Sequence, residues 1–182
     1  MKTNLKKAAL VFAAIFAGTL LFAEKEGGAK TPAWVKLFDK AVESNTTGTL
    51  SHSKETKKLY KKLDVNNDKI LFYSVAVRTD KDAAAQTAKA QAKDLAAKSV
   101  LANAQEIIDQ KLGKGKVSLK QPQNILGYAK AQEFVVNKDG SFTAYSIWQI
   151  TNLNYKEAAN SLANDYLRAN GYLPKSGPTN ER

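Results

Sequence analysis

The chain has no cysteine and only one histidine, His52, among its 182 residues. The absence of cysteine excludes disulfides, thiolate metal sites and the lipid-modified cysteine of a bacterial lipoprotein. With one imidazole and no thiol, the chain lacks the paired nucleophile and base that covalent catalysis usually needs. A metal site built on histidine is also not expected with His52 alone. Carboxylates are plentiful, but no spacing singles out a catalytic pair. We therefore expect no enzymatic activity, no cofactor and no metal.

Long apolar runs are scarce, and the chain has one, from Ala8 to Ala23, after three lysines within the first seven residues. A basic start, a short apolar run and a small residue at its end are typical of a secretory signal peptide. We expect cleavage between Ala23 and Glu24; an uncleaved membrane anchor is the alternative. No other stretch is apolar enough to span a bilayer, so the mature chain is predicted to have no transmembrane helix.

Acidic residues are outnumbered by basic ones, which gives a formal net charge of +11. Removing the three lysines of residues 1–23 lowers this charge to +8. Export argues against nucleic acid as the partner, and the lysines are spread along the chain. A lysine-rich solvated surface is one interpretation, and attraction to anionic envelope polymers or lipid headgroups, including peripheral membrane association, is the other.

Two short helices are predicted after a leader that begins at residue 24. The first starts at Thr31-Pro32, a capping hydroxyl followed by proline at the first helical position. Its apolar residues Trp34, Leu37 and Phe38 recur at helical spacing and are the candidate interface. The second helix, "SKETKKLYKKLDV", has only Leu59, Tyr60 and Leu63 to bury.

A calcium loop is suggested and then excluded just before the first strand. Asp64, Asn66 and Asp68 match the first three ligand positions of such a loop. Lys69 stands where the loop needs glycine, and Val75 stands where it needs a bidentate glutamate. The segment is therefore predicted to be a polar turn leading into a strand.

The stretch "KILFYSVAVR" alternates two faces, as a strand does, and one face becomes small towards its end at Ser74 and Ala76. The long helix that follows, with Thr79 or Asp80 as its cap and Gly113 as its end, contains ten alanines in residues 82–105. Small side chains let a helix approach a sheet closely. Its predicted packing face consists of Ala85, Ala88, Ala92, Leu95, Ala96, Ser99 and Ala102.

A hairpin and a last helix complete the pattern. Asn137 to Gly140 is a turn signal between two runs rich in aromatic and β-branched residues. Both faces of the second run are apolar, so the sheet is either covered on both sides or has one face as an interface. Asn154, with Glu157 completing a capping box, is predicted to start a helix that ends near Gly171 and Pro174.

Together these elements predict an α+β fold with a small, mainly antiparallel three-stranded sheet. A long alanine-rich helix packs on the sheet, and further helices flank it at the N- and C-terminal ends. The predicted organisation is a signal peptide over 1–23, a leader with short helices over 24–69, a single domain over 70–172 and a disordered tail over 173–182.

This order of elements resembles the LPP-twenty lipoprotein family and the flagellar assembly proteins of the FlgP and FlgT N-terminal domain type. The resemblance lies in "TPAWV", "FYSVAVRTDKDAAAQTAKAQAKDLAAKSV" and "SFTAYSIWQI", within residues 31–151. Ser74 and Ala76 stand where the family often has glycine, and its lipidated cysteine is missing, so direct lipid anchoring does not carry over. The resemblance implies a structural or assembly role in the cell envelope, often flagellar.

These observations predict an exported, non-catalytic protein of the periplasm or the periplasmic face of the outer membrane. It would act by contact with an envelope or flagellar protein, or by self-assembly. The alternative is a periplasmic binding module for an anionic envelope polymer.

Overall fold

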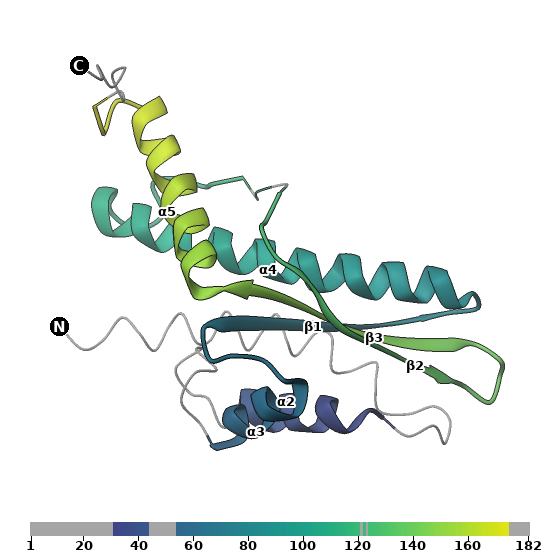
Figure 1. Cartoon of the computed structure of the whole chain (residues 1–182). Coiled ribbons are helices and arrows are strands. Elements are labelled where there is room, and N and C mark those ends of the chain that lie inside the picture. The colour runs from purple at the N-terminus through teal and green to yellow at the C-terminus, as the bar shows by residue number, and fades with distance from the viewer. Residues whose placement is uncertain (1–30, 44–53, 121, 123, 175–182) are drawn as a thin grey trace, which may run out of the picture.

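The computed structural model describes residues 31–43, 54–120, 122 and 124–174. The predicted signal peptide, its cleavage between Ala23 and Glu24, His52 and most of the predicted tail lie outside the described residues. Within the described part, four helices and three strands form the α+β fold that the sequence predicts (Figure 1). Their order is α2 (Ala33–Glu43), α3 (Lys54–Leu63), β1 (Lys69–Arg78), α4 (Lys81–Leu112), β2 (Tyr128–Val136), β3 (Phe142–Thr151) and α5 (Asn152–Ala169).

The three strands form one antiparallel sheet in the order β1-β3-β2, with β3 in the middle. Asn137 and Ser141 close the hairpin between β2 and β3, where the Asn137 N–H donates to the Ser141 carbonyl at 2.8 Å. Gly140 has a positive φ of 81° in this turn, a conformation that glycine adopts without steric cost. The predicted hairpin is therefore confirmed.

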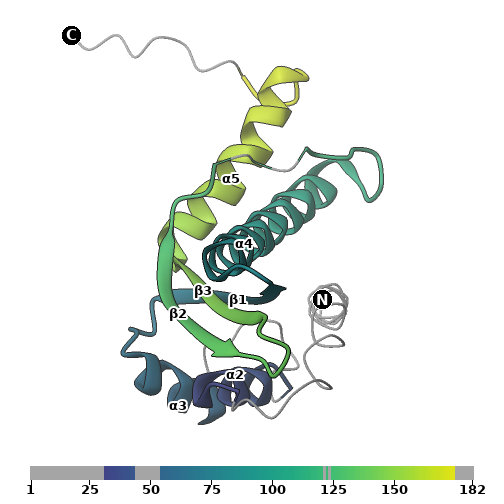
Figure 2. The same cartoon turned by 90° about the vertical axis from the view of Figure 1, so that its right-hand side faces the viewer.

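Helices cover both faces of the sheet (Figure 2). On one face, Phe72, Trp148 and Ile150 pack with α4 and α5. On the other face, Leu71, Tyr73, Tyr145 and Ile147 pack with α2 and α3. Alternate residues of β1 and β3 point to opposite faces, as their sequences predict. Helices α2 and α3 thus share a core with strands of the segment 70–172.

Small residues bring α4 close to the sheet near the start of the helix. Ala76 and Ala144, which are cross-strand partners, form a buried cluster with Ala84 and Ala88. The hydroxyl of Ser74 donates to the Ala88 carbonyl at 2.6 Å. This direct contact between a strand side chain and the helix backbone is the close approach that the small face of β1 predicts.

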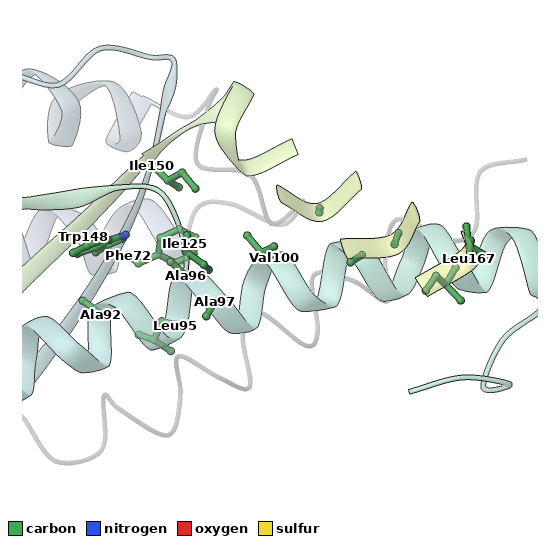
Figure 3. Packing of buried hydrophobic residues seen from close by; sticks show 14 residues of the cluster. Phe72, Ala92, Leu95, Ala96, Ala97, Val100, Ile125, Trp148, Ile150 and Leu167 are labelled. Carbon is green, nitrogen blue, oxygen red and sulfur yellow. The ribbon is translucent and has the colours of Figure 1, made fainter. Parts of the chain in front are cut away.

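The buried face of α4 agrees in part with the predicted packing face (Figure 3). Five of its seven residues are buried, whereas Ala85 and Ala102 are only partly buried. The prediction was incomplete because α4 changes its packing partner along its length. Its first turns contact the sheet, and α4 also packs against α5 further along. Burial consequently extends to Ala84, Ala97, Val100, Ala104 and Ile108.

The helix ends confirm two predictions and correct one. Asp80 caps α4 by accepting from the Ala83 N–H at 2.7 Å, and Gly113 follows its last turn. Helix α5, however, begins at Asn152 and is capped by Thr151, whose Oγ1 accepts from the Asn154 N–H at 3.0 Å. The prediction of Asn154 as the cap, with Glu157 in a capping box, was wrong because the last residue of β3 itself supplies the hydroxyl.

Ser74 and Ser146 face each other across β1 and β3, but replacing each by alanine is expected to change stability in opposite directions. Ser74 and Ser146 are cross-strand partners and both are buried, but among the described residues Ser146 Oγ has no hydrogen-bond partner. We expect Ser74→Ala to lower the free energy of unfolding by about 1 kcal/mol, since it removes a buried hydrogen bond. Ser146→Ala is expected to leave it unchanged or raise it by up to about 1 kcal/mol, because an unpaired buried hydroxyl is costly. Urea unfolding measures both, and equal losses would contradict the assignment.

Candidate interaction surface

The predicted interface residues of α2 lie inside the protein. Trp34 is 3% exposed and Phe38 is fully buried, while Leu37 is partly buried against the same cluster. The Trp34 ring meets Tyr73 and Tyr145 edge to face, with centroid separations of 6.0 and 6.3 Å. These geometries are favourable for aromatic pairs. The three residues fasten α2 to the sheet, so they are not a surface open to a partner.

Polar contacts reinforce this layer. The Tyr73 hydroxyl donates to Asp39 at 2.7 Å, and the Trp34 indole N–H donates to Glu133 of β2. Burial raises the pKa of Tyr73 well above its usual range, and the hydrogen bond with Asp39 raises it further. Burial, with the charge of Asp68 second, raises the pKa of Tyr60 to about 12, and its hydroxyl donates to the Lys69 carbonyl. Both phenols are therefore neutral donors near pH 7, with a structural role.

The sheet has two edge strands, β1 and β2, and their outer edges differ in character. Strand β2 carries a register irregularity between Ala129 and Ala131, and the charged residues Lys130 and Glu133 lie beside it. Bulges and charges of this kind are what native proteins use to prevent an edge strand from pairing with another chain. The β2 edge is therefore protected.

Strand β1 is charged only at its two ends, Lys69 and Arg78, and it has no bulge. Its ten residues pair with β3 in an uninterrupted register from Lys69 to Arg78, and residues 70–77 contain no charge, proline or bulge. Within the part of the chain that the structure describes, β1 pairs with β3 alone. An edge strand presents the N–H and C=O groups of its outer side to further pairing.

Exposed valines mark the same end of both edge strands. Val77 of β1 is 47% exposed, and Val136 of β2 is 63% exposed. Phe134 of β2 is also 36% exposed, and the Lys81 ammonium lies 4.8 Å from its ring centroid. Helix α4 packs mainly on β1 and β3 and touches β2 little, so the Phe134 and Val136 side chains remain exposed although the strand edge is protected.

The described residues contain no group of three or more histidine, cysteine, aspartate or glutamate side chains placed to hold a metal ion. Among the same residues, no helix combines the length and the apolar character needed to cross a membrane.

Sequence reasoning did not identify the β1 edge as a surface. The uncharged run from Ile70 to Val77 is visible in the sequence, and so are the charges of "YAKAQEFVV". The missing information was the strand order, because an uncharged strand in the centre of a sheet has no free edge.

No protein-family model, curated protein or solved structure matches this chain.

Proposed function

We propose that the chain is a non-catalytic protein exported to the bacterial cell envelope, where it acts by protein–protein contact in a flagellar or outer-membrane-associated assembly. Export rests on the signal-like residues 1–23, and the assembly role rests on the family resemblance of residues 31–151. The observation that supports the contact itself is the difference between the two strand edges: β1 has an uninterrupted, uncharged middle, whereas β2 has a bulge and charges.

The occupant that we propose for this edge is the β1 strand of a second copy. Antiparallel pairing of two β1 edges joins two three-stranded sheets into one, with a two-fold axis between the copies. It also brings the Asp68 end of one strand beside the Arg78 end of the other. At each end Arg78 of one copy approaches Asp68 of the other, whose side chain is 58% exposed and already pairs with Lys69 at 3.2 Å.

A matched pair of valine substitutions tests this contact. We expect Val77→Lys to weaken self-association at least tenfold, because it places a second cation beside Arg78 in the strand, and charged residues within an edge strand oppose pairing. Val136→Lys, on the protected β2 edge, should change it less than twofold. Sedimentation velocity across a concentration series measures association, and thermal melting shows that both variants stay folded, as expected for exposed positions.

A wild-type chain that is monomeric throughout the series would overturn self-pairing. A larger loss for Val136→Lys than for Val77→Lys would move the contact to β2, and would also count against the β1 edge.

A further inference from the structure

The outer face of α3 consists of lysine. Its buried residues are Thr56, Leu59, Tyr60 and Leu63, which point towards the sheet and α2. At 100° per residue, the other side of the helix is an arc of about 140°. This arc holds all five lysines of the helix, and every one is exposed: Lys54, Lys57, Lys58, Lys61 and Lys62.

These five charges are not balanced locally. Among the described residues, none of the five forms an ion pair. The nearest acids along the chain are Glu55, partly buried at the edge of the arc, and the exposed Asp64 directly after the helix. By contrast, Lys98 of α4 pairs with Asp94 one turn away, at 2.8 Å. Helix α2 lies beside α3 (Figure 1). It carries two further exposed lysines, Lys36 and Lys40. The α2–α3 layer thus presents a basic outer surface.

Helix stability does not account for this arrangement. Lys54 and Lys58, Lys57 and Lys61, and Lys58 and Lys62 are like-charged pairs four residues apart, and such pairs destabilise a helix. The helix dipole favours cations only in the last turn, where Lys61 and Lys62 lie. The remaining three lysines gain nothing from the dipole, so the pattern points to an external anion.

We propose that the outer face of α3 docks the protein on an anionic lipid bilayer, with the lysine ammonium groups at the headgroup phosphates. A helix exterior is convex, so it suits an extended charged surface better than an enclosed small ligand. Lysine acts as a point charge and needs no fixed anion geometry. The apolar side of α3 is buried in the protein, so α3 lies on the headgroups without inserting.

Two features favour lipid over nucleic acid. The arc has no arginine, the residue that binds phosphates and base edges through two parallel hydrogen bonds. It also exposes no aromatic ring on which a base could stack, because Tyr60 points inward. This docking surface is separate from the β1 edge, and neither proposal depends on the other.

Co-sedimentation of the mature chain, from Glu24 onwards, with vesicles tests the proposal. One set of vesicles contains about one third phosphatidylglycerol, and the other is phosphatidylcholine alone. The test variant changes all five α3 lysines to glutamine. The control variant changes five exposed lysines elsewhere, so that the net charge is the same: Lys89, Lys111, Lys114, Lys120 and Lys156.

The α3 variant is expected to bind the phosphatidylglycerol vesicles at least tenfold more weakly than wild type. The control variant should bind them with less than a twofold loss. Replacing the five α3 lysines by arginine should retain binding, which shows that charge and not folding is the cause. Binding should also disappear near 1 M salt, where the screening length is about 3 Å.

Equal losses in the two glutamine variants would overturn the proposal, because net charge alone would then explain binding. Equal binding of wild type to both vesicle types would overturn it as well. Tighter binding to duplex DNA than to the anionic vesicles, lost in the α3 variant, would assign the surface to nucleic acid instead.

Discussion

Replacing Trp34 by alanine is expected to lower the free energy of unfolding by about 3–5 kcal/mol, the usual cost of truncating a large buried aromatic side chain. The indole fills the space between α2 and the sheet and contacts Tyr73 and Tyr145 edge to face. Its loss leaves a cavity between α2 and the sheet. In a chain of this size the melting temperature should fall by on the order of 10 °C, as measured by circular dichroism.

Trp34→Phe is the matched control. It keeps an aromatic ring in the core but removes the hydrogen bond that the indole N–H donates to Glu133. The loss should be about 1–2 kcal/mol, because Glu133 is exposed and regains water as a partner. An alanine variant that melts like wild type would mean that α2 is not docked on the sheet in solution.

Gly127→Ala is the second substitution with a large expected effect, about 3–5 kcal/mol of unfolding free energy. A Cβ at this position would lie 2.5 Å from the Trp148 Nε1 atom and 2.6 Å from the Gln149 carbonyl oxygen. Trp148 is buried and Gln149 belongs to the central strand, so neither moves away easily. The overpacking adds to the cost of a positive φ, 153°, at an alanine.

Gly115→Ala separates these two causes. Gly115 also has a positive φ, 76°, but a Cβ there would meet no heavy atom within 4 Å. We expect it to cost only about 1 kcal/mol, for the backbone conformation. Equal losses at the two glycines in urea unfolding would show that contact with Trp148 and Gln149 contributes nothing at Gly127.

The candidate surfaces differ in how much of each the sequence reveals. The lysine arc of α3 follows from helical spacing alone, because Leu59, Tyr60 and Leu63 already define the side that must be buried. The β1 edge does not follow from spacing, since it requires knowing that β3 lies between β1 and β2. The prediction of an interface at Trp34 was wrong for a similar reason. The amphipathic pattern of α2 does not show whether its apolar side packs on the protein's own sheet or on a partner.

By itself, the sequence determined the features that depend on near neighbours in the chain. They include the alternating faces of β1, a cap of α4 at Thr79 or Asp80, the glycine at the end of α4 and the turn at Asn137 to Gly140. Each of these is decided within a few residues by backbone sterics, a capping oxygen or strand periodicity.

Only the tertiary structure decided what depends on contacts distant in sequence. The strand order, the docking of α2 through Trp34 and the change of partner along α4 all involve residues tens of positions apart. The cap of α5 is a local contact that the sequence prediction placed three residues too late, because Thr151 serves both as the last residue of β3 and as the cap. Long-range packing selects among arrangements that are locally equivalent, which is why the open edge of β1 emerges only from the folded chain.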